Sequence, residues 1–413
     1  MNPDSTAATS SPGPHFRTTP PLSLYVHLPW CLRKCPYCDF NSHTLPAGSD
    51  QGEQPEADYI AALLADLETE LPLVWGRTVQ SIFIGGGTPS LLSAAAIETL
   101  LDGIRARLAL KPDAEITLEA NPGTAEAGRF AAYRAAGINR LSLGVQSLND
   151  AHLRALGRIH DASEARNAVV LARRAGFERI NLDLMFGLPH QTPGQAMEDL
   201  AQVLALEPEH LSWYQLTLEP NTAFYHAPPP RPDADTCCQI QEQGQTILSA
   251  AGFRQYEVSA WARSGEACRH NLNYWRFGDY IGIGAGAHGK ITDAAAGGIR
   301  RRRKKRHPRD YLAATAERDF LSSENRPTAA DLVFEFALNH LRLREPLRVD
   351  QFETACGLPG RLIRPRLDAA CADGLLQQTP AGFTHTELGW RFLDDLVGRF
   401  LPEPTPDANS HGA

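Results

Sequence analysis

Alternating strand and helix patterns over residues 22–218 constrain the fold of this chain more than any other feature of its sequence. Short apolar runs that predict buried strands recur at 22–27, 81–84, 115–119, 140–146, 179–185 and 210–218. Apolar residues at helical spacing lie between them, at 58–71, 94–108, 126–136, 163–175 and 195–206. Strands that alternate with helices form parallel sheets through right-handed crossovers. The sequence therefore predicts an α/β fold with six parallel strands, either a partial barrel or a doubly wound sheet.

Polar and potentially reactive residues gather at the points where these strands end. They are the Gly-rich turn at 85–88, Glu119, Asn121, Gln146 and Asp183. In a (β/α) barrel the functional site lies at the C-terminal ends of the strands. We therefore expect these groups to surround one site, together with the loop that follows the first strand.

Three cysteines in that loop, Cys31, Cys35 and Cys38, have the spacing C-x3-C-x2-C. Thiolates are the usual ligands of iron–sulfur clusters, which most often take four cysteines. Three close cysteines without a fourth would leave one iron of a cluster open to another ligand. Zinc is the alternative, and His43 is then the candidate for the fourth ligand of a closed tetrahedral site. The triplet thus predicts a metal or cluster site, with an incomplete cluster preferred to zinc.

The triplet, with Tyr37 directly before its last cysteine and a strand before its first, resembles the motif of the radical SAM superfamily. In that superfamily a [4Fe-4S] cluster binds S-adenosylmethionine through its open iron, and an electron from the cluster cleaves it to a 5′-deoxyadenosyl radical. The glycines at 85–87 resemble the superfamily's Gly-rich strand end, whose backbone meets the methionine amino group. The resemblance implies a partial (β/α)6 TIM-like barrel with the cluster on Cys31, Cys35 and Cys38.

Further shared phrases narrow the resemblance to the HemN/HemW family, which includes the oxygen-independent coproporphyrinogen III oxidases. These phrases are YVHLPWC at 25–31, GGGTPS at 85–90, LEANP at 118–122, GVQS at 144–147, LGRIH at 156–160 and DLMFGLP at 183–189. The resemblance implies S-adenosylmethionine contacts at matching residues. Those expected at the methionine end are Tyr25, Gly86, Gly87 and Thr88, with Tyr37 beside the cluster. Those expected at the ribose and adenine are Glu119, Gln146, Arg158 and Asp183.

Within the family the cysteine loop resembles the HemW branch, whose members are proposed heme chaperones. The oxidases carry a further cysteine two positions after the triplet, where this chain has Phe40. The oxidases also have an N-terminal extension that reaches the substrate, whereas only about 24 residues precede the core of the first strand here. We interpret the chain as a protein that binds heme and delivers it to hemoproteins such as respiratory enzymes. A coproporphyrinogen III oxidase, or a radical SAM enzyme for an unrelated substrate, remains the alternative, so enzymatic activity stays open.

The phrase HNLNYW at 270–275 resembles the HNxxYW signature of the same branch. Imidazole is a common axial ligand of heme iron, and Tyr274 and Trp275 are suited to pack against a porphyrin face. The alternative is that His270 is a core histidine beside structural aromatic residues. We expect His270 to contribute to heme binding, and Cys268 is a second candidate ligand.

The remaining parts of the chain suggest further divisions. Residues 21–225 are expected to form the barrel, and 226–322 an extension that holds the 270–275 phrase. Residues 323–400 are expected to form a small winged-helix-like α+β domain, with helices at 329–343, 348–356 and 363–373 and a hairpin at 375–386. The polar segments 1–20 and 401–413 are predicted to be disordered tails.

Charge and hydropathy limit the partners that the chain is expected to have. A net charge of −8 makes a general nucleic-acid binder improbable, because phosphate contacts need an excess of Lys and Arg. The seven consecutive cations at 300–306 are interpreted as a solvated loop, with attraction of heme propionates or anionic lipids as the alternative. No apolar run approaches the roughly 18 residues of a membrane span, and no secretory signal is evident, so a cytoplasmic protein is expected. A homodimer, and an electron donor if S-adenosylmethionine is cleaved, complete the expected partners.

Overall fold

The computed structural model of this protein describes residues 14–45, 56–123 and 127–402. These residues divide into two compact units. The barrel unit comprises residues 21–291 and 301–324, and the C-terminal unit comprises the remaining described residues. The tails predicted at 1–20 and 401–413 fall mainly on residues outside the described ranges.

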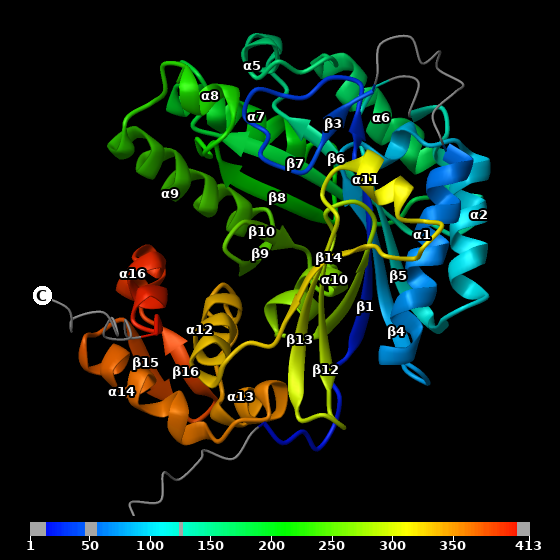
Figure 1. Cartoon of the computed structure of the whole chain (residues 1–413). Coiled ribbons are helices and arrows are strands. Elements are labelled where there is room, and N and C mark those ends of the chain that lie inside the picture. Colours follow the sequence, from blue (N-terminus) through cyan, green and yellow to red (C-terminus); the bar gives the residue numbers. More distant parts are fainter. Residues whose placement is uncertain (1–13, 46–55, 124–126, 403–413) are drawn as a thin grey trace, which may run out of the picture. The chain divides into compact units, whose positions relative to one another are not determined.

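One open sheet forms the framework of the barrel unit (Figure 1). Its central strands are β1 (Leu22–Leu28), β4 (Thr78–Gly86), β5 (Ala109–Ala120), β6 (Arg140–Gln146), β7 (Ile180–Phe186) and β8 (His210–Gln215). Each of them pairs in parallel with the next in chain order. The prediction of six parallel strands in an α/β fold is therefore confirmed.

Further strands extend this sheet at both of its edges. Beyond β8 lie β10 (Ala260–Ala262) and β9 (Arg254–Glu257), which are antiparallel. Beyond β1 lie β11 (Asp279–Ile283), which is parallel to it, and then β12 (His288–Asp293), β13 (Gly298–Lys304) and β14 (Leu321–Asn325). Because β9 and β14 end the strand order, the sheet stays open among the described residues, as a partial barrel requires.

Helices cover the outer side of the sheet (Figure 1). They are α1 (Glu56–Glu70), α2 (Ala94–Arg105), α4 (Phe130–Ala136), α6 (Ala162–Arg174) and α7 (Pro193–Leu204). Local signals explain where several of them begin: Asp161 and Thr192 form capping boxes with the third helical residues, and Ser93 caps α2. All five predicted helices are present, although residue 126, where one was expected to begin, lies outside the described ranges. No helix in the described ranges combines the length and apolar character that crossing a bilayer requires.

Along the strands, side chains point alternately to the hydrophobic core and to the inner side of the sheet, where the site lies. On β6, Leu141, Leu143 and Val145 are buried in the hydrophobic core. The residues between them, Ser142 and Gly144, instead line a cavity on the inner side of the sheet. Successive side chains of a strand point to opposite faces, so one face of each strand stabilises the fold while the other carries polar groups.

The prediction of a solvated loop at 300–306 is wrong for the first five of its seven cations, whereas Lys305 and Arg306 follow the strand outside any regular element. Residues 298–304 form strand β13, and Lys304 is only 1% exposed. Its Nζ lies 2.5 Å from carboxylate oxygens of both Asp66 and Glu70, one turn apart on α1. A buried lysine is tolerated when carboxylates compensate its charge. The sequence did not reveal these partners because they lie more than 200 residues away.

The C-terminal unit contains the helices and the hairpin that the sequence predicts for 323–400. The helices are α12 (Ala329–His340), α13 (Val349–Cys356) and α14 (Arg364–Ala372), and the hairpin pairs β15 (Leu376–Thr379) with β16 (Gly382–His385). Two short helices follow that the sequence analysis did not predict, α15 (Glu387–Arg391) and α16 (Leu393–Gly398). This is an α+β unit, and its likeness to a winged helix stays a prediction.

Candidate functional site

Two cavities lie on the inner side of the sheet of the barrel unit. The smaller, of about 300 Å³, is lined by all three cysteines of the motif, and we call it the cysteine cavity. The larger, of about 610 Å³, is lined mainly by the aromatic residues Tyr25, Phe83, His270, Tyr274, Trp275 and Tyr280, and we call it the aromatic cavity. Phe40, Gly86 and Glu119 line both cavities, so the two share a wall.

The cysteine cavity brings together most of the predicted site residues. Besides the cysteines it is lined by Tyr37, Gly86, Gly87, Thr88, Glu119, Gln146, Arg158 and Asp183. Only Tyr25 and His270 of the predicted set lie elsewhere, in the wall of the aromatic cavity. Ser142, Ser212 and Tyr214 also line the cysteine cavity, and the sequence analysis missed them. The alternation of β6 and β8 was the signal that could have identified them, since they occupy the same faces as the predicted residues.

Each of the three thiols has a polar neighbour. Thr88 Oγ1 donates to Cys31 Sγ at 3.4 Å, and Arg158 Nη1 donates to Cys35 Sγ at 3.6 Å. Ser42 Oγ lies 3.7 Å from Cys38 Sγ. Donors that point at sulfur stabilise the thiolate form that a cluster requires. Burial raises the pKa of the Cys31 and Cys38 thiols, so binding of a cluster would release protons.

The donor set fits a three-thiolate cluster better than a zinc ion held by His43. All three cysteines are free and line one cavity. His43 Nε2 is instead 3.1 Å from Asn41 Oδ1, and His43 is not among the residues that line this cavity. Within residues 14–45, 56–123 and 127–402, no three His, Cys, Asp or Glu side chains are arranged to hold a single ion. Cys31, Cys35 and Cys38 would thus hold a cluster at this cavity.

The glycines after β4 let the cysteine loop pass close to the strand end. A Cβ on Gly87 would lie 2.5 Å from the carbonyl oxygen of Trp30, and one on Gly86 would lie 2.6 Å from the His27 ring. Gly86 also has a φ of +119°, which residues with a side chain rarely adopt. The backbone of Gly87 and Thr88 donates to Leu28 and Trp30, each at 2.7 Å. The glycines therefore fix the cysteine loop against the sheet.

Two partly buried carboxyl groups, Glu119 on β5 and Asp183 on β7, face the same cavity. Burial, together with the nearby charge of Asp183, raises the pKa of Glu119 to about 8. Glu119 Oε2 accepts from the backbone N–H of Gly86 at 3.1 Å. Burial likewise raises the pKa of Asp183, which accepts from Asn181 at 2.8 Å and from Ser142 at 3.3 Å. Such groups are suited to hydrogen-bond the hydroxyls of a polar ligand.

Arg158 and Gln146 complete this wall. Arg158 Nη2 donates at 2.7 Å to both Asn121 Oδ1 and the carbonyl of Gly144, whereas its buried Nε has no hydrogen-bond partner. Gln146 has a φ of +67° at the end of β6 and accepts from Tyr214 at 2.9 Å. Unpaired buried polar atoms and strained residues concentrate at binding sites. The residues of this cavity therefore fit a polar ligand such as S-adenosylmethionine.

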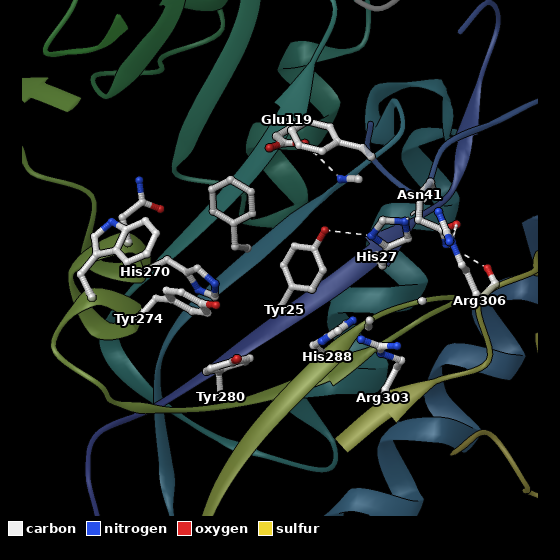
Figure 2. A pocket seen from close by; sticks show the side chains of 17 residues that line it. Tyr25, His27, Asn41, Glu119, His270, Tyr274, Tyr280, His288, Arg303 and Arg306 are labelled. Atoms are coloured by element: carbon white, nitrogen blue, oxygen red, sulfur yellow. Dashed lines mark hydrogen bonds between the residues drawn. The ribbon is translucent and has the colours of Figure 1, made fainter. Parts of the chain in front are cut away.

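The aromatic cavity places His270 beside aromatic rings (Figure 2). His270 belongs to α10 (Arg269–Trp275), and its ring centroid lies 5.2 Å from that of Phe83 and 6.4 Å from that of Tyr25. Its Nδ1 is 3.3 Å from Ser81 Oγ. Burial lowers the pKa of His270 to about 3, so the imidazole is neutral at physiological pH. A neutral imidazole in a cavity wall is available as a ligand to a metal.

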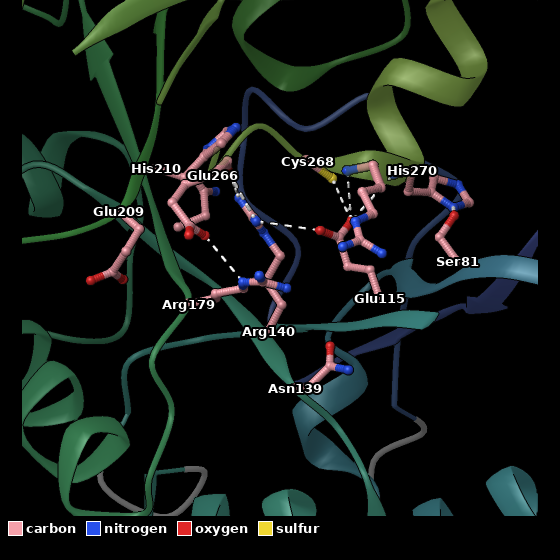
Figure 3. Close-up of polar contacts among 12 residues, drawn as sticks. Ser81, Glu115, Asn139, Arg140, Arg179, Glu209, His210, Glu266, Cys268 and His270 are labelled. Carbon is pink, nitrogen blue, oxygen red and sulfur yellow. Dashed lines mark hydrogen bonds and ion pairs between the residues drawn. The ribbon is translucent and has the colours of Figure 1, made fainter. Parts of the chain in front are cut away.

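A buried ion pair holds the start of α10 in place (Figure 3). Glu115 and Arg140 are both almost inaccessible, with an N–O distance of 3.4 Å. Glu115 Oε1 also accepts from the backbone N–H groups of Arg269 at 2.8 Å and His270 at 3.2 Å. Cys268 Sγ lies 3.4 Å from the same oxygen and does not line the aromatic cavity. Glu115 thus positions His270, whereas Cys268 is packed away from a ligand in that cavity.

Comparison with known proteins agrees with this architecture. The Radical SAM superfamily model matches residues 25–203. The chain is 53% identical over 384 residues to the heme chaperone HemW of Escherichia coli, covering 93% of this chain and 99% of that protein. It is 48% identical to the heme chaperone HemW of Haemophilus influenzae over 388 residues, with the same coverage. The structure of the E. coli coproporphyrinogen III oxidase HemN, a radical SAM enzyme, matches with a TM-score of 0.78 and 25% identity, covering 92% of this chain and 90% of that one.

These relatives settle the family. The radical SAM superfamily implies a [4Fe-4S] cluster and S-adenosylmethionine, and the thiols and polar wall of the cysteine cavity fit both. The alignments with the HemW proteins run over almost their whole length, and the HemN structure shares the fold. This chain belongs to the HemN/HemW family of the radical SAM superfamily, and within that family to the HemW proteins.

Proposed function

We propose that this protein binds heme and delivers it to hemoproteins, the function for which its HemW relatives are named. The observation that carries the proposal is the aromatic cavity. Its volume of about 610 Å³ lies within the range of small-molecule sites. Tyr and Trp rings suit the flat apolar face of a porphyrin, and the neutral imidazole of His270 suits its iron.

The cysteine cavity would hold the cofactors beside this heme site. Cys31, Cys35 and Cys38 would bind the cluster, and Gly86, Gly87, Thr88, Glu119, Gln146, Arg158 and Asp183 would surround S-adenosylmethionine. Bound together, these cofactors supply one-electron chemistry. Glu119, whose carboxyl group holds its proton near neutral pH, can donate a hydrogen bond into either cavity.

A coproporphyrinogen III oxidase is the second candidate, and the similarity to the HemN structure favours it. Phe40 argues for the chaperone. It stands where the oxidases carry a further cysteine, and the residue is 62% exposed at the wall shared by the two cavities. An apolar ring cannot supply the thiol that an oxidase has at this position.

The recipients that we propose are hemoproteins such as respiratory enzymes, with the transfer taking place in the cytoplasm. An electron donor would be needed only if S-adenosylmethionine is cleaved. A homodimer is a further proposal, which sedimentation of the purified protein would test directly.

A heme titration tests the main proposal. Wild-type protein should bind one heme per chain, and His270→Ala should bind it about tenfold more weakly or worse, because the axial ligand is lost. His226→Ala, which removes an exposed histidine outside the cavity, is the matched control and should bind like wild type. Equal affinity of wild type and His270→Ala would remove His270 from the heme site.

Anaerobic turnover separates the chaperone from the oxidase. The reconstituted protein should form no doubly decarboxylated product from coproporphyrinogen III with S-adenosylmethionine and a reductant, in an assay where a true oxidase succeeds. Formation of that product, and its loss in Cys35→Ala, would make the oxidase the main function.

A further inference from the structure

The seven consecutive cations at 300–306 differ in how their charge is compensated. Lys304 pairs with Asp66 and Glu70, and Arg302 lies 3.3 Å from carboxylate oxygens of both Glu70 and Glu324. Lys305 pairs with Asp319 at 2.8 Å. Arg300 pairs with Asp293 at 2.7 Å, and Arg301 donates to Tyr280 Oη at 3.2 Å. Five of the seven thus have partners within the protein.

Arg303 and Arg306 have no acidic partner among the residues that the structure describes. Among the described residues, the guanidinium of Arg303 makes no hydrogen bond or ion pair, and Arg306 donates only a long bond of 3.4 Å to Asn41 Oδ1. Both line the aromatic cavity. Figure 2 shows them on the opposite side of the cavity from His270 and Tyr274.

The pleat of β13 explains why Arg302 and Lys304 have carboxylate partners whereas Arg303, among the described residues, does not. Successive side chains of a strand alternate between its two faces. Arg302 and Lys304 point to the carboxylates of α1, so Arg303 between them must point to the other face, toward the cavity. The exposure of Arg303 is therefore a consequence of the same strand register that buries Lys304.

The aromatic cavity is consequently amphipathic. One side carries aromatic rings and the neutral imidazole, and the other carries two guanidinium groups. Glu119 is the one carboxyl group among its lining residues, and its pKa of about 8 leaves it mostly uncharged at neutral pH. The net charge of the lining is therefore positive, although the whole chain carries −8.

We infer that Arg303 and Arg306 form a carboxylate-binding subsite of the aromatic cavity, which holds the propionate groups of a tetrapyrrole. The inference rests on the proposed heme binding and adds to it the groups that orient the ligand. Guanidinium groups bind carboxylates through paired N–H donors in a fixed geometry. His288 on β12 lines the same side and offers a further ring N–H to the ligand. Propionates held there direct the opposite part of the macrocycle toward the aromatic wall.

Three ligands test the subsite by titration in one detergent-containing buffer: heme, heme dimethyl ester and iron-free protoporphyrin IX. The ester lacks the carboxylates, and protoporphyrin IX lacks the iron. Wild type should bind heme about tenfold more tightly than its ester. The variant R303Q/R306Q should lose that preference and should also bind protoporphyrin IX more weakly. His270→Ala should weaken heme binding while leaving protoporphyrin IX nearly unchanged.

A charge-matched variant controls for general electrostatic attraction. K305Q/R309Q removes the same charge from neighbouring positions that do not line the cavity, and it should bind all three ligands like wild type. The inference is overturned if R303Q/R306Q keeps the preference for heme over its ester, or if K305Q/R309Q loses it equally. The proposed function itself fails if wild type binds none of the three ligands, whereas normal heme binding by His270→Ala would remove only His270 from the site.

Discussion

Each residue in the wall shared by the two cavities lines both of them. Gly86, which lines both cavities, allows the cysteine loop to lie against β4, and Glu119 reaches both cavities from β5. A change at one of these positions is therefore expected to affect cluster assembly and ligand binding together, in contrast to changes at His270 or Arg303.

Gly87→Ala should displace the cysteine loop, because its new Cβ would lie 2.5 Å from a backbone oxygen that cannot rotate away. We expect a loss of stability of about 1–3 kcal/mol and a lower iron and sulfide content after reconstitution. Gly194→Ala is the control, since a Cβ there meets nothing within 4 Å. The thermal unfolding midpoint and metal analysis check both variants, and full cluster loading in Gly87→Ala would contradict this role.

The raised pKa of Glu119 predicts a pH dependence of stability. The folded carboxyl group keeps its proton up to about pH 8, whereas the unfolded one releases it near its ordinary pKa of 4.5. Between these values the folded state binds more protons, so this group lowers stability as pH rises, by about 1.4 kcal/mol per pH unit at most. Glu119→Gln removes the effect. The difference in unfolding free energy, variant minus wild type, should increase from pH 5 to pH 8, and a constant difference would refute it.

At the scale of elements, the strands and helices of the barrel were largely predictable, because each carries its own apolar pattern. β5 begins at Ala109 rather than at 115, because Ala109 and Leu110 already pair with Thr78 and Val79, ahead of the polar segment around Pro112. β13 was misread because its cations are compensated by α1, far away in the sequence. The short helix α10 received no helix prediction, because seven residues carry too little periodicity.

Most of the candidate site was also predictable, again because the sequence itself carries the relevant pattern. Strand ends are visible in the sequence, so most residues of the cysteine cavity were identified. Arg303 was assigned to a solvated loop because only the register of β13 directs it to the aromatic cavity, and Arg306 lies just beyond the end of that strand. Tyr25 lies in that cavity because its position on β1 faces α10 rather than the thiols.

The anchoring of α10 gives a prediction for an element. Glu115→Ala would leave the buried Arg140 unpaired and two N–H groups of α10 unbonded, which should cost about 3–5 kcal/mol of stability. Asp113→Ala removes the exposed carboxylate that also contacts Arg269, and it should change little. Chemical denaturation measures both. Equal effects of the two substitutions would show that Glu115 does not anchor the helix.

For the whole molecule, the shared wall predicts coupling between the two cavities. Occupancy of the cysteine cavity by S-adenosylmethionine should change the heme affinity, because Glu119 and Gly86 contact both spaces. By linkage, heme must change the affinity for S-adenosylmethionine by the same factor. We expect a factor of about 5 or more. Titrations of each ligand with and without the other measure it, with Cys35→Ala as the control that lacks the cluster. Because linkage requires the two factors to be equal, a difference between them would indicate an error in one of the titrations. A factor of one would exclude coupling.

The alternating register of β13 also bears on which sequence changes this protein can accept during evolution. A substitution in β13 affects only one face of the strand, and therefore either the ion pairs with α1 or the lining of the aromatic cavity. A single-residue insertion or deletion before Arg302 would instead exchange the two faces, taking Lys304 from its carboxylates and Arg303 from the cavity in one step. Homologous chains should therefore vary in the residues of this strand more freely than in the length of the segment that precedes it.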